Sequence, residues 1–150
     1  IYSIGRTVSV NKDVKLEKGP YAGLLLDKRS FERNNYIMDD LDTIKSLTNE
    51  NDPILIISEL SWMYLYIDRP FATYSAWQPV LEVNRLIYYY KENPEKTPKY
   101  IYVCWIFIPT SVTSGHQINK TRANNLVEEI TKTFNCEVSE LSNGFLLALK

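Results

Sequence analysis

The stretch YIYVCWIFI, residues 100–108, is the longest β-rich run of this 150-residue chain. Its apolar side chains fall on both faces of an extended strand, which is typical of a strand covered on both sides, as in parallel sheets. We therefore predict a central parallel strand here. Two shorter apolar runs that end at polar or turn residues, 22–26 and 54–57, are predicted to be further buried strands.

Segments with helical periodicity separate these strands. Apolar residues recur at helical spacing up to residue 47, and Ser30 is predicted to cap this amphipathic helix. A short helix is predicted over residues 59–66, and two more over residues 80–88 and 120–134. Strands and helices are therefore expected to alternate along the chain.

The C-terminal residues are predicted to form a hairpin. Residues 137–139 and 145–149 flank Ser142-Asn143-Gly144, and an Asn-Gly pair between two strands is a strong hairpin signal. Residues 22–57 fit a strand, helix, strand unit, whose crossover is expected to be right-handed. The chain is predicted to belong to the α/β class, as a three-layer α/β/α sandwich with a mostly parallel central sheet and an antiparallel C-terminal hairpin.

Length and composition indicate one domain. Apolar residues make up 45% and charged residues 23% of the chain, close to the averages of globular proteins. We expect residues 1–150 to form a single α/β domain with residues 1–18 as a peripheral β arm. Because 17 Lys and Arg residues balance 18 Asp and Glu residues, the basic face that nucleic acids require is not expected, and we predict no nucleic-acid partner.

The sequence carries no complete catalytic motif. It has no glycine-rich nucleotide-binding loop and no nucleophile elbow, and its one histidine, His116, lies in a polar segment. Cys104 and Cys136 are interpreted as small buried apolar residues rather than metal or redox ligands, and a disulfide between them stays open. We predict no catalytic residue, no metal site and no cofactor in this chain.

The most informative candidate site follows the strand predicted at residues 54–57. Open α/β sheets bind ligands in the crevice beyond the carboxyl ends of their strands, and the next side chains suit a polar ligand that stacks on aromatic rings. The predicted ligand-binding residues are Glu59, Trp62, Tyr66, Arg69, Tyr74 and Trp77. In the structural alternative, Trp62, Leu65 and Tyr66 lie on the buried face of a short helix. Arg69 then pairs with the carboxylate of Glu59 or Asp68.

Two motifs resemble a known family. They are Gly19-Pro20-Tyr21-Ala22-Gly23-Leu24 and Trp62-x-Tyr64-Leu65-Tyr66-x-x-Arg69-Pro70-x-Ala72-Thr73-Tyr74-Ser75. Over residues 19–78 the chain resembles the soluble C-terminal region of bacterial multi-pass membrane proteins of the glycosyltransferase-like, GT-C class related to protein mannosyltransferases. The resemblance implies a domain on the extracytoplasmic side of the cell membrane, with membrane spans upstream of residue 1. It also implies that the catalytic acidic residues and the lipid-linked sugar donor belong to parts outside this chain.

We therefore expect a non-catalytic extracytoplasmic accessory domain of a bacterial polytopic membrane protein of the glycosyltransferase class. Its expected partners are the membrane portion of the same polypeptide and a glycan or lipid-linked sugar. Two alternatives stay open. The first is a freestanding small-ligand-binding or enzymatic domain that uses the crevice after residues 54–57. The second is a protein-interaction module that presents Tyr88, Tyr89 and Tyr90.

Overall fold

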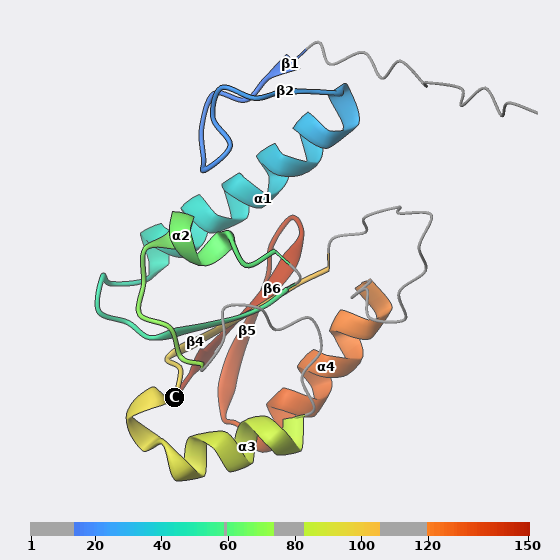
Figure 1. Ribbon diagram of the computed structural model, residues 1–150. Helices are drawn as coiled ribbons and strands as arrows, with labels where there is room; N and C mark the ends of the chain where they lie inside the picture. The colour runs from blue at the N-terminus through green and yellow to red at the C-terminus, as the bar shows by residue number, and fades with distance from the viewer. Residues whose placement is uncertain (1–13, 59, 74–82, 106–119) are drawn as a thin grey trace, which may run out of the picture.

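The central sheet brings together strands that are distant in the sequence. A computed structural model describes residues 14–58, 60–73, 83–105 and 120–150 (Figure 1). The sheet has the order β3, β4, β6, β5, and these strands are Ile54–Ile57, Tyr100–Cys104, Gly144–Leu149 and Cys136–Glu140. β4 therefore lies inside the sheet, as predicted for this part of the chain, while residues 106–108 lie outside the described residues.

The α/β class and the antiparallel C-terminal hairpin are confirmed, but the prediction of a mostly parallel sheet is wrong. β3 runs parallel to β4, whereas β6 runs antiparallel to both β4 and β5. The reason is that a short hairpin joins strands of opposite direction, and β6 is inserted between β4 and β5. The hairpin thus contributes to two antiparallel pairings of the sheet.

Helices cover both faces of this sheet (Figure 1). The helices α1 (Lys28–Leu47) and α2 (Met63–Ile67) pack on one face, and α3 (Val83–Glu92) and α4 (Lys120–Thr133) pack on the other. Alternate strand residues divide between the two cores. The core under α1 and α2 contains Ile54, Ile56, Tyr102, Cys104 and Leu146, and the other contains Leu55, Ile57, Ile101, Val103, Phe145 and Leu147.

Local capping sets the ends of the helices. Asp27, not Ser30 as predicted, is the N-cap of α1, and the backbone N–H and hydroxyl of Ser30 donate to its carboxylate at 3.0 and 2.7 Å. α2 ends at Asp68, which adopts the left-handed conformation with φ 52°. A one-turn 3₁₀ helix, η1 (Pro94–Lys96), follows α3. Within the described residues, no helix is both long and apolar enough to cross a bilayer.

The predicted buried strand over residues 22–26 is wrong. The extended part is β2 (Leu25–Leu26), which pairs antiparallel with β1 (Val14–Lys15) in a separate ribbon beside α1 (Figure 1). Leu24 and Leu25 are 53% and 54% exposed, so this apolar run faces solvent. Because β2 pairs with β1 and lies outside the main sheet, the predicted strand, helix, strand unit is not formed.

Backbone turns explain why this run stays out of the main sheet. The Leu16 N–H donates to the Leu24 carbonyl at 2.9 Å, and the Gly23 N–H donates to the Leu16 carbonyl at 2.8 Å. Gly23 adopts φ 94°, a left-handed conformation that favours glycine. These bonds fold the run back on β1 as a tight two-stranded ribbon. Its apolar side chains therefore lie on this ribbon and not in the interior of the main sheet.

A buried carboxylate connects α1 to the C-terminal hairpin. Asp40 is 2% exposed and accepts hydrogen bonds from the backbone N–H groups of Ser142 and Asn143 at 2.9 and 2.8 Å. The Tyr102 hydroxyl donates to the same carboxylate at 2.7 Å. Burial raises the pKa of Asp40, although these three bonds favour its charged form. Asp40 therefore holds the middle of α1 against the hairpin turn.

We predict that Asp40→Ala lowers the free energy of unfolding by about 2–4 kcal/mol, because two backbone N–H groups and a buried phenol lose their acceptor. Urea unfolding followed by circular dichroism measures this change. Asp39→Ala is the matched control, since Asp39 is the preceding helix residue and forms an exposed 3.5 Å ion pair with Lys18. Its expected cost is below about 1 kcal/mol, and equal losses in the two variants would contradict the anchoring role.

Candidate functional site

The predicted ligand-binding residues that the structure describes have three different environments. Trp62, Tyr66 and Arg69 lie within or next to α2, and each contacts a different part of the fold. The other three predicted residues, Glu59, Tyr74 and Trp77, lie outside the described residues. A shared crevice site for all six stays a prediction.

Arg69 closes the C-terminal ends of two helices. Its guanidinium donates to the carbonyl oxygens of Lys45 and Thr48, both at 3.2 Å, at the end of α1. It also donates to the carbonyl oxygens of Ile67 and Asp68 at 3.3 and 3.0 Å, at the end of α2. A cation is favourable at a helix C-terminus, where carbonyl groups lack partners. These contacts give Arg69 a structural role, but its partner at Asp68 is the backbone carbonyl and not the predicted carboxylate. The predicted burial of Leu65 on this helix is wrong, because Leu65 is 75% exposed.

Arg69→Gln is expected to lower the free energy of unfolding by about 1–2 kcal/mol, because the last carbonyl groups of α1 lose a charged donor. Thermal unfolding and urea unfolding both measure this loss. Arg29→Gln is the control, since Arg29 is an exposed arginine in the first turn of the same helix, and its expected change is within about 0.5 kcal/mol. An Arg69→Gln variant as stable as the parent chain would rule out the capping role.

Tyr66 is held against the surface of α1. Its hydroxyl donates to the Asp42 carboxylate at 2.6 Å, and the Lys45 ammonium lies 4.8 Å from the centre of its ring. Lys18 donates to the same carboxylate at 2.9 Å. Burial raises the pKa of Asp42, but the bonds from Tyr66 and Lys18 outweigh this and lower it below its ordinary value. Both ends of the Tyr66 side chain therefore have structural partners.

Other residues of the same segment cover the outer edge of β3. The Ile56 N–H donates to the Tyr64 hydroxyl at 2.6 Å. The Ile54 N–H donates to the Pro70 carbonyl at 3.0 Å, and the Ala72 N–H donates to the Ile54 carbonyl at 2.9 Å. Burial raises the pKa of Tyr64 to about 12, so its hydroxyl stays protonated at neutral pH. An edge strand with its polar groups paired in this way is protected from pairing with other chains.

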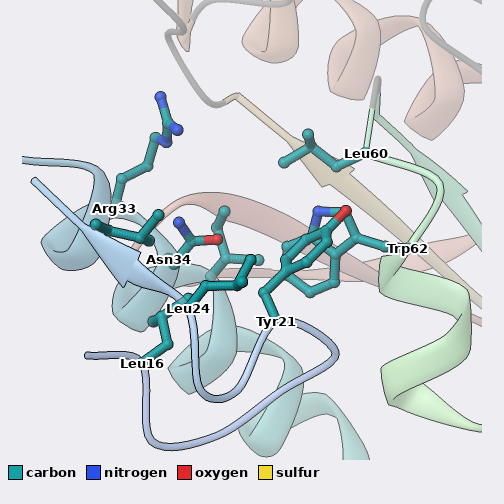
Figure 2. Close-up of a pocket in the computed structure, with 9 residues that line it drawn as sticks. Leu16, Tyr21, Leu24, Arg33, Asn34, Leu60 and Trp62 are labelled. Carbon is teal, nitrogen blue, oxygen red and sulfur yellow. The ribbon is translucent and has the colours of Figure 1, made fainter. Parts of the chain in front are cut away.

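Trp62 faces a pocket between the β1–β2 ribbon and α1 (Figure 2). Its ring meets the ring of Tyr21 edge to face, with the ring centres 5.7 Å apart and the planes at 73°. The pocket has a volume of about 300 Å³, at the lower end of the range for small-molecule sites. Aliphatic side chains form most of the remaining wall: Leu16, Leu24, Leu26, Ile37 and Leu60.

Two polar side chains of α1, Arg33 and Asn34, complete the lining of the pocket. The Asn34 amide nitrogen donates to the Ser30 carbonyl at 2.7 Å, which fixes this side chain along the helix. Arg33 is partly buried and has no ion pair or hydrogen bond with any residue in the described ranges. Figure 2 shows its side chain on the side of the pocket away from the two rings. The pocket thus combines an apolar wall with one unpaired positive charge.

The sequence predicted Trp62 as a ligand-binding residue, but it did not predict this pocket. Leu24 lies within the run predicted to be a buried strand, and Tyr21 directly precedes it. Arg33 is a polar residue of a helix that was predicted from its apolar residues. The available signal was the pair Gly19 and Gly23, which bracket Tyr21 and both adopt a positive φ. Two such glycines predict a tight turn, and a turn exposes an aromatic residue between them.

Metal and thiol chemistry have little basis in the described residues. These residues contain no group of three or more His, Cys, Asp or Glu side chains that could hold a metal ion. Cys104 is buried and Cys136 is partly buried, and the two thiols are not joined in a disulfide. Burial raises the pKa of Cys136, which lowers the fraction of reactive thiolate at neutral pH.

Comparisons with protein-family models, with curated proteins and with solved structures found no match to this chain. The family resemblance over residues 19–78 is therefore carried by its two motifs alone.

Proposed function

We propose that this chain is a non-catalytic ligand-binding domain whose site is the pocket between Tyr21, Trp62 and Arg33. The supporting observation is that one pocket of about 300 Å³ is lined by an aromatic pair, an aliphatic wall and a guanidinium that has no bonded partner among the described residues. Small-molecule sites typically combine a mainly apolar lining with a few polar groups that orient the ligand. The lining of this pocket fits that description.

The chemistry of the lining supports binding rather than turnover. The described lining residues include no carboxylate, histidine, cysteine, serine or lysine that would serve as nucleophile or general base. Their polar groups are the hydroxyl of Tyr21, the amide of Asn34, the guanidinium of Arg33 and the indole N–H of Trp62. A guanidinium stays protonated in proteins, so Arg33 suits an anion-binding role rather than proton transfer.

The wider setting that we propose is an extracytoplasmic accessory domain of a bacterial polytopic membrane protein of the glycosyltransferase-like class. The two motifs that carry this resemblance meet at the pocket, because Tyr21 belongs to the first and Trp62 to the second. The membrane portion of the same polypeptide and a glycan or lipid-linked sugar are the partners proposed for this setting. Protease treatment of intact cells and of lysed cells tests the location, since an extracytoplasmic domain is cleaved in cells whose membrane is intact.

Binding at the pocket is tested with the neutral dye N-phenyl-1-naphthylamine, whose fluorescence rises in an apolar site. We predict saturable binding to the parent chain, and binding about fivefold weaker by Leu24→Gln, which removes about 1 kcal/mol of apolar contact. Leu24 suits this substitution because it lines the pocket while its side chain is half exposed, so the fold is spared.

The matched control is Leu25→Gln. Leu25 is the next residue, has nearly the same exposed fraction as Leu24, and is not among the lining residues. Its affinity for the dye is expected to equal that of the parent chain. Equal weakening by both substitutions, or dye binding that never saturates, would contradict a defined site. Displacement of the dye by a soluble disaccharide would favour a glycan as the occupant.

A further inference from the structure

We infer that the ligand of this pocket is an amphipathic organic anion, with an apolar body against Tyr21 and Trp62 and a carboxylate that faces Arg33. This inference rests on the proposed binding function and names the chemical class of the ligand. It follows from the charge around Arg33 and from the composition of the wall.

The charge around Arg33 is not balanced by the neighbouring acidic residues of α1. Glu32 lies 3.9 Å from Lys28 in an ion pair on the exposed side of the helix. Arg29, one turn before Arg33, adds a second positive charge, and two like charges at this spacing oppose helix formation slightly. The first turn of α1 contains no acidic residue, and the carboxylate of the N-cap residue Asp27 accepts hydrogen bonds from the backbone N–H and the hydroxyl of Ser30. The positive charge beside the pocket therefore fits an external anion.

The wall favours an apolar ligand body over a sugar. Five of the nine lining residues are aliphatic and two are the aromatic pair, which leaves Arg33 and Asn34 as the polar side chains from α1. Every sugar hydroxyl that enters such a pocket must lose its water, and an unpaired hydroxyl carries a free-energy penalty. A hydrocarbon or aromatic body instead gains from the burial.

A carboxylate is the headgroup that suits the remaining polar groups. The guanidinium presents N–H donors in a planar fork that matches the two oxygens of a carboxylate. Figure 2 shows the hydroxyl of Tyr21 and the indole nitrogen of Trp62 on the same edge of the ring pair. Arg33 lies on the opposite side of the pocket, so a ligand with its apolar body against the rings would direct its carboxylate away from them toward Arg33.

The test compares two probes of the same skeleton, 4-phenylbutanoate and 4-phenylbutan-1-ol, as competitors of N-phenyl-1-naphthylamine. We expect the parent chain to bind the acid about fivefold more tightly than the alcohol, and this ratio to fall as salt is added. Arg33→Gln is expected to bring the ratio to about one, because the acid then loses the positive charge that favours it over the alcohol. Arg29→Gln, which removes the same charge from an exposed position on the same helix, is expected to keep the ratio.

The outcomes separate this inference from the function on which it rests. If the dye binds and the acid and alcohol compete equally, or if Arg33→Gln keeps the preference for the acid, the anion inference is overturned while the pocket remains a binding site. An acid that fails to displace bound dye overturns it as well. If the dye itself does not bind in a saturable way, the proposed binding function fails first.

Discussion

The buried carboxylate of Asp40 is the constraint on which the rest of the fold depends. It joins the middle of α1 to a hairpin turn more than one hundred residues away in the sequence. Burial raises the pKa of Asp40 even though the carboxylate accepts three hydrogen bonds, so its ionised form is held against a desolvation penalty. Such a group specifies one arrangement of helix and sheet, because any other arrangement leaves the charge without its donors.

The same constraint reaches the sheet through Tyr102 and Gly144. The Tyr102 ring lies over Gly144, where a Cβ would come within 2.6 Å of the ring carbon Cζ. Only glycine lets this ring lie flat on the neighbouring strand and direct its hydroxyl to Asp40. The Asn-Gly pair that identifies the hairpin in the sequence therefore has a second role, which is to make room for the phenol.

Strands and helices could be predicted from the sequence where the local pattern of apolar and turn residues determines their conformation. The apolar run at residues 100–104 forms the inner strand, and the Asn-Gly signal marks the hairpin, because both depend on side-chain alternation and turn chemistry. The run at residues 22–26 has the same apolar character, yet it folds back as a ribbon. Apolar composition does not distinguish the two runs, because the difference lies in the backbone bonds from Leu16 to Leu24 and from Gly23 to Leu16, which pair this run with β1.

Strand direction was not predictable in the same way. Alternation of strands and helices favours a parallel sheet, and the β3–β4 pair has this form. The Asn-Gly signal predicts the antiparallel β5–β6 pair, but not the antiparallel pairing of β6 with β4. That pairing joins residues far apart in the sequence, as do the bonds from Tyr102 and Ser142 to Asp40. Contacts of this range leave no periodic trace in the sequence, so the place of β6 between β4 and β5 appears only in the structure.

At the candidate site, structural side chains differ from candidate binding side chains in whether their polar atoms are already hydrogen-bonded, and not in residue type. Tyr66 and Arg69 have the chemistry of ligand-binding residues, but their polar atoms are bonded to Asp42 and to the carbonyl groups that end α1. Arg33 has the same chemistry, lies against an apolar wall, and has no bonded partner in the described ranges. A partly buried guanidinium without a bonded partner carries a desolvation penalty. Its place on the side of the pocket opposite Tyr21 and Trp62 therefore favours a ligand that spans the pocket.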